Sequence, residues 1–76
     1  MTAIKQYDMV RVVRVRDRRF TDSAPSFQRH PVVGDVGTVV EVYVDPPGCE
    51  VECCTAEGLV TIWLEVLHPD ELEVIG

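Results

Sequence analysis

Hydrophobic positions in this chain recur at every second residue within short, valine-rich segments, and turn-forming residues separate one segment from the next. Such alternation is typical of strands that bury one face. The pattern predicts an all-β fold of five strands, over residues 9–16, 38–44, 49–54, 59–66 and 72–75. In the third of these, Cys49, Val51 and Cys53 are expected to point inward.

Glycine and proline mark the predicted turns. Residues 34–37 place two glycines around an aspartate, and residues 45–48 read Asp-Pro-Pro-Gly. Both are compositions that favour tight turns. Residues 55–58 end on Gly58, which we expect in the left-handed conformation of a hairpin turn. A single helical turn is expected to begin at Pro69, because proline is tolerated in the first position of a helix.

The first predicted strand breaks strict alternation between Val12 and Val13. A β-bulge or a strong bend there would restore one apolar face, whereas a regular strand would point an arginine into the core. We therefore expect a bulge or bend that turns the valines inward and the arginines outward: Val10, Val12, Val13 and Val15 against Arg11, Arg14 and Arg16.

Residues 17–33 form one long connection, in which Pro25 and Pro31 exclude a central strand. A loop of this length in a small domain is often functional. It contains Phe20 and Phe27, for which two interpretations remain. Either both rings anchor the loop to the core, or one of them is exposed in a binding groove.

This layout, with a long first loop, two tight hairpins and a one-turn helix before a short fifth strand, resembles the SH3-like barrel. The spans GDVGTVVEVY, CEVEC and LHPDELEV more closely resemble a family of small bacterial SH3-like proteins of unknown function. The resemblance implies one five-stranded SH3-like barrel domain over residues 1–76 and implies no activity. A second resemblance, carried by DMVRV with Gly34 and Gly37, is to the KOW motif and implies nucleic-acid binding. The short, basic, glycine-containing loop of that motif is replaced here by residues 17–33.

A length of 76 residues with 46% hydrophobic composition indicates one folded domain with a thin core. Self-association would bury more apolar surface. The N-terminal residues lack the apolar region of a signal peptide, and no apolar run is long enough to span a membrane. We therefore expect a cytoplasmic protein without a membrane partner. The odd number of cysteines, three, agrees with that compartment.

Charge is unevenly distributed along the chain, whose net charge is −6. Residues 1–30 carry seven cations and three acids, a net +4, whereas residues 31–76 carry ten acids and no lysine or arginine. The candidate anion-binding residues are Arg11, Arg14, Arg16, Arg18 and Arg19. Alternatively, this row pairs across the sheet with Glu41, Glu50 or Glu52. Nucleic acid is the less favoured partner, because the field of the whole molecule repels phosphate.

Catalytic and cofactor sites are not expected. Cysteine and histidine occur at positions 30, 49, 53, 54 and 68, without the spacing of a metal site or a nucleophile motif. We therefore expect a binding module with no catalytic residue, metal or cofactor.

The strand predicted at residues 59–66 is apolar on both faces, so one face must lie outside the core. We expect this to be an exposed interface that binds a second copy or another protein. The candidate interface residues are Val39, Tyr43, Leu59 and Trp63, with Phe20 and Phe27 of the long loop. In the alternative interpretation the loop folds back and covers them.

Overall fold

The computed structural model describes residues 3–16, 24–25 and 27–76. Its strands are β1 (Met9–Val12), β2 (Val36–Val44), β3 (Pro47–Cys54), β4 (Thr61–Leu67) and β5 (Leu72–Val74), and a 3-10 turn, η1 (Pro69–Glu71), precedes β5. The all-β class, the five strands and the helical turn starting at Pro69 are confirmed. Within these ranges no helix is long and apolar enough to cross a membrane.

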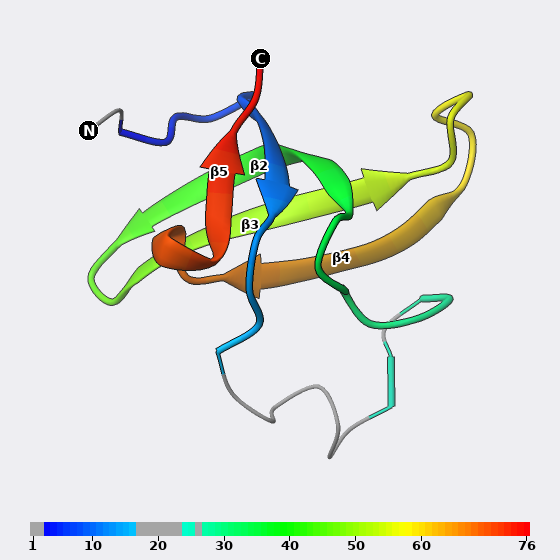
Figure 1. Cartoon of the computed structure of the whole chain (residues 1–76), viewed down its shortest axis with the longest axis horizontal. Helices are drawn as coiled ribbons and strands as arrows, with labels where there is room; N and C mark the ends of the chain where they lie inside the picture. The colour runs from blue at the N-terminus through cyan, green and yellow to red at the C-terminus, as the bar shows by residue number, and fades with distance from the viewer. Residues whose placement is uncertain (1–2, 17–23, 26) are drawn as a thin grey trace.

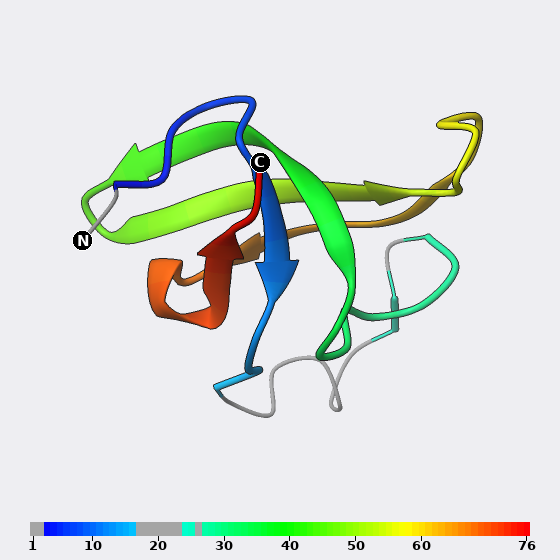
Figure 2. The same ribbon diagram turned by 45° about the horizontal axis from the view of Figure 1, so that its top comes forward.

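All five strands belong to one antiparallel sheet in the order β4-β3-β2-β1-β5 (Figure 1). In the described part of the chain β4 and β5 are not paired with each other, so no closed barrel is formed. β1 and β5 run crosswise to β3 and β4, as Figures 1 and 2 both show. The apolar core lies between these two parts of the bent sheet, with contributions from β1, β2, β3, β4 and β5.

The prediction for β3 is confirmed. Cys49, Val51 and Cys53 point inward and are only 1%, 0% and 4% exposed. Gly58 has a φ of 71°, the left-handed conformation expected at the end of the hairpin turn. The turn before β2 likewise places Gly34 at a φ of 99°.

β2 contains a bulge that the sequence pattern did not reveal. The register between β2 and β3 shifts after Val39, where Val40 is the extra residue. One inserted residue reverses which side chains face the core. Val39 is therefore fully buried, whereas Tyr43 is 45% exposed. The prediction that Val39 and Tyr43 share one exposed face was wrong for this reason.

A second bulge lies where β4 pairs with β3. Cys53 pairs with Trp63, but the next residue of β3 pairs with Thr61, which leaves Ile62 as the extra residue. Trp63 is consequently fully buried, while Leu59, on the other side of the bulge, is 81% exposed. The prediction that Trp63 forms part of an exposed interface was therefore wrong.

β1 ends at Val12, and the bulge expected after this residue is absent. Val10 and Val12 lie in the core, whereas Val13 and Val15 are only half-buried. The backbone N–H of Val13 donates to the carbonyl oxygen of Glu71 at 2.8 Å, which continues the pairing of β1 with β5 by one residue. The arginines point outward as expected, although no bulge is present: Arg11, Arg14 and Arg16 are all exposed.

Glu71 of η1 holds the segment that follows β1, residues 13–16, in place. Its side chain is fully buried, and its Oε2 accepts a hydrogen bond from the backbone N–H of Arg16 at 2.8 Å. Oε1 accepts from the backbone N–H of His68 at 2.7 Å, which closes the capping box of the turn. A buried carboxylate without such donors would be strongly destabilising. The sequence analysis did not single out this residue.

Glycine is required at position 37 of β2 because the neighbouring strand β3 lies too close to leave room for a side chain. A Cβ atom at this position would lie 2.6 Å from the carbonyl oxygen of Glu52 and 2.7 Å from Cγ1 of Val51. The substitution Gly37→Ala should therefore force β2 and β3 apart and lower the free energy of unfolding by about 2 kcal/mol. Urea denaturation measures this loss.

The matched control for Gly37→Ala is Val36→Ala, one residue earlier, where the side chain is 38% exposed. We expect this control to cost less than about 1 kcal/mol. Equal stability of the wild type and Gly37→Ala would contradict the close packing of β2 on β3.

Candidate interaction surfaces

The carboxylate of Asp35 joins three parts of the chain. Its Oδ2 accepts hydrogen bonds from Nη1 of Arg29 at 2.8 Å, the backbone N–H of Val32 at 3.0 Å and Nε1 of Trp63 at 2.8 Å. Its Oδ1 accepts from Nη2 of Arg29 at 3.0 Å. The side chain of Asp35 is only 12% exposed. It therefore supplies the acceptor that the buried indole N–H of Trp63 needs.

The charge of Asp35 is stabilised by these donors. Burial alone raises the pKa of its carboxyl group, but the hydrogen bonds from Arg29, Val32 and Trp63 together outweigh burial and lower the pKa below its ordinary value. The same hydrogen bond raises the pKa of Arg29. The pair is ionised at neutral pH and fastens the end of the long loop to the core.

We call residues 27–33 the strap. The backbone N–H of Gln28 donates to the carbonyl oxygen of Ile62 at 3.0 Å, and Nε2 of Gln28 donates to the carbonyl oxygen of Thr61 at 3.3 Å. The strap thus lies along the beginning of β4 and satisfies the carbonyl of the bulged residue Ile62. This arrangement brings Phe27 to the end of the sheet at which β4 begins.

Three exposed apolar residues lie near the beginning of β4, and we call them the strap-end patch: Phe27, Leu59 and Val60. They are 51%, 81% and 48% exposed. Phe27 is therefore exposed rather than buried in the core, and its place in a binding groove stays a prediction. Phe20, the other aromatic residue of the loop, lies outside the described residues. Val60 was not among the candidate interface residues predicted from the sequence.

Tyr43 lies far from this patch, near the turn between β2 and β3. Its ring flanks Gly48, where a Cβ atom would meet Cδ2 of Tyr43 at 4.0 Å and Cγ1 of Val66 at 2.9 Å. Two apolar side chains thus flank a glycine on the outer face of the sheet. Both remain accessible, since Tyr43 is 45% and Val66 46% exposed.

Acidic side chains continue this outer face. Glu41 of β2 and Glu50 of β3 are direct cross-strand partners, and Glu50 is in turn opposite Val66 of β4. Residues opposite each other in an antiparallel pair project from the same face. We call the surface formed by Tyr43, Val66, Glu41 and Glu50 the outer ledge.

The arginine row is partly neutralised by acids of the C-terminal half. Nη1 of Arg11 lies 3.4 Å from Oε1 of Glu73, and Nη1 of Arg16 lies 3.7 Å from Oδ1 of Asp70. Pairing with C-terminal acids was expected, but these partners come from η1 and β5. The predicted partners Glu41, Glu50 and Glu52 make no ion pair in the described part of the chain.

The other arginines of the row are not held together as a cluster by the described contacts. Arg14 is exposed at the side of a groove, and Arg18 and Arg19 fall outside the described residues. The geometry therefore gives no support to an anion site built from the whole row.

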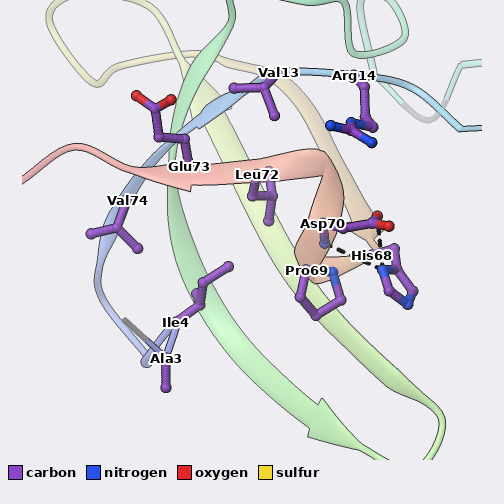
Figure 3. Close-up of a pocket in the computed structure, with 10 residues that line it drawn as sticks. All are labelled: Ala3, Ile4, Val13, Arg14, His68, Pro69, Asp70, Leu72, Glu73 and Val74. Carbon is purple, nitrogen blue, oxygen red and sulfur yellow. Dashed lines mark hydrogen bonds and ion pairs between the residues drawn. The ribbon is translucent and has the colours of Figure 1, made fainter. Parts of the chain in front are cut away.

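The groove beside Arg14 is open and lies between the N-terminal segment, η1 and β5 (Figure 3). Ile4, Leu72 and Val74 line its apolar part. At its polar end, Nδ1 of His68 lies 2.9 Å from Oδ1 of Asp70 and accepts the backbone N–H of Asp70 at 3.2 Å. The histidine ring thus caps η1, and the described residues of the lining include no serine, threonine or cysteine as a nucleophile.

Two of the three cysteines, Cys49 and Cys53, are buried in the core. Burial raises the pKa of the Cys49 and Cys53 thiols, which disfavours their thiolate forms. Cys54 is a half-buried free thiol. Across the residues that the structure covers, no group of three or more His, Cys, Asp or Glu side chains is arranged to hold a metal ion.

The depressed pKa of Asp35 predicts a pH dependence of stability. The unfolded chain, with an aspartate pKa of about 3.9, takes up the proton first as the pH falls. The free energy of unfolding should therefore fall from about pH 4 downward through the native pKa. Asp35→Asn should lower the free energy of unfolding by about 2 kcal/mol at pH 7. It should also flatten the acid slope, that is, the decrease of this free energy as the pH falls below about 4.

Urea denaturation at several pH values measures both effects. The control is Asp45→Asn, which removes an exposed carboxylate from the turn between β2 and β3. An Asp35→Asn variant with the stability and acid slope of this control would show that the carboxylate does not fasten the strap.

No curated protein and no solved structure matches this chain. Residues 27–74 match the family model described as a domain of unknown function (DUF4926). The matched region runs from the strap to β5 and includes Asp35, Trp63 and Glu71. Because the match covers more than half of the chain, the protein belongs to the DUF4926 family.

Proposed function

We propose that this protein is a non-catalytic binding module that self-associates through the strap-end patch. The observation that carries this proposal is the exposure of Phe27, Leu59 and Val60 at one end of the sheet. Large apolar side chains grouped on a surface are typical of interaction sites. An aromatic residue among them supplies the anchor that such interfaces favour.

A second copy fits this patch better than a charged partner does. The arginine of the strap, Arg29, is compensated by its hydrogen bonds to Asp35. The core is also small, with nine buried apolar residues in the described part. Burying the patch against a second copy would add about 25 cal/mol for each Å² of apolar surface removed from water. The three residues of the patch themselves carry no charge.

We further propose that the sheet is an SH3-like barrel with an open seam. The long first connection, the tight turns after β2 and β3, and η1 before a short β5 support this assignment. In this arrangement the strap belongs to the first loop, and a ligand would bind beside it rather than inside the thin core. We also propose that the protein acts in the cytoplasm.

Light scattering over a concentration series tests the self-association. We expect the wild type to have twice the 8.5 kDa mass of the chain at high concentration. Leu59→Asp should restore the mass of a single chain, because it places a charge in the apolar contact.

Val44→Asp provides a matched control. Val44 is 85% exposed, close to the 81% of Leu59, but lies at the other end of the sheet, beside the turn between β2 and β3. This control should keep the mass of the wild type. A wild type that is monomeric at every concentration, or equal dissociation of both variants, would rule out the strap-end patch as the interface.

A further inference from the structure

The outer ledge lies outside the self-association surface and carries two carboxylates, of which Glu41 accepts a hydrogen bond from the backbone N–H of Val42 at 3.2 Å. Glu41 and Glu50 face each other directly across β2 and β3. Like charges in this position destabilise a sheet. Residues 31–76 contain no lysine or arginine, so the strands of this face cannot supply a cation. In the described structure neither carboxylate forms an ion pair.

The apolar half of the ledge is shaped by a glycine. Gly48 has no side chain, so the space beside its Cα atom is flanked by Cδ2 of Tyr43 on one strand and Cγ1 of Val66 on another. The bulge at Val40 is what turns Tyr43 to this face, together with Glu41. Bulges often re-aim side chains beside functional sites. The result is an aromatic and aliphatic platform directly beside two carboxylates.

We propose that the outer ledge binds a basic segment of a partner protein. An arginine side chain has the matching chemistry, because its methylene groups pack on apolar surface while its guanidinium reaches the carboxylates. The guanidinium also binds favourably over a tyrosine ring. The arginine stem would lie against Tyr43 and Val66, with its charge on Glu41 and Glu50.

Other occupants fit this surface less well. A second copy presenting the same ledge would bring four carboxylates together, which is repulsive. A nucleic acid would present phosphates to Glu41 and Glu50. The groove of Figure 3 has no comparable excess of charge, since Asp70 and Glu73 at its side pair with Arg16 and Arg11. Charge complementarity therefore selects a cationic protein segment at the outer ledge.

Fluorescence anisotropy with a labelled peptide of alternating arginine and valine tests this proposal. We expect saturable binding, and none by the counterpart peptide with glutamate in place of arginine. The double variant Glu41→Gln/Glu50→Gln should bind about tenfold more weakly. The matched control, Glu57→Gln/Glu73→Gln, removes the same charge elsewhere and should bind within about twofold of the wild type.

A change in folding cannot explain the expected weakening of peptide binding in the double variant Glu41→Gln/Glu50→Gln. Removing the opposed carboxylates should leave the melting temperature unchanged or raise it, because the repulsion between Glu41 and Glu50 disappears. Tyr43→Leu should weaken binding while keeping the charge. Leu59→Asp should bind the peptide as the wild type does, so that failure of self-association leaves this test intact. Absence of binding, or equal weakening in both double variants, would overturn the proposal.

Discussion

The hydrogen bond from the buried indole of Trp63 to Asp35 is the constraint on which the rest of the structure depends. A large aromatic side chain can fill a thin core only if its N–H finds an acceptor. Asp35 supplies that acceptor at 2.8 Å, and the same carboxylate binds Arg29 and the backbone of Val32. One interaction thus fills the core, fixes the inward face of β4 and fastens the strap.

The two bulges determine which apolar side chains are exposed on the surface. The extra residue Val40 sends Val39 inward and Tyr43 outward, and the extra residue Ile62 separates Trp63 from Leu59. At both bulges, a neighbouring segment donates a hydrogen bond to the backbone carbonyl oxygen of the extra residue. Nε2 of Gln6 donates to the carbonyl of Val40 at 3.0 Å, and the strap donates to that of Ile62. Apolar surface is therefore displayed at two separate places, the strap-end patch and the outer ledge.

Most of the fold could be predicted from the sequence, because alternation and turn residues act locally. The inward face of β3, the left-handed Gly58 and the helical turn at Pro69 followed directly. The candidate site could be predicted only in part. A bulge depends on pairing between strands, so alternation alone grouped buried Val39 with exposed Tyr43. The roles of Asp35 and Glu71 depend on donors far away in sequence, and only the turn composition around Asp35 marked its position.

Trp63 is the single tryptophan of the chain, so its fluorescence reports directly on this central interaction. The emission of the folded protein, compared with that of the urea-unfolded chain, and its quenching by iodide measure how far the indole is removed from water. The structure predicts emission at shorter wavelength than in the unfolded chain, with little quenching. Emission and quenching equal to those of the unfolded chain would place the ring in water and contradict the account.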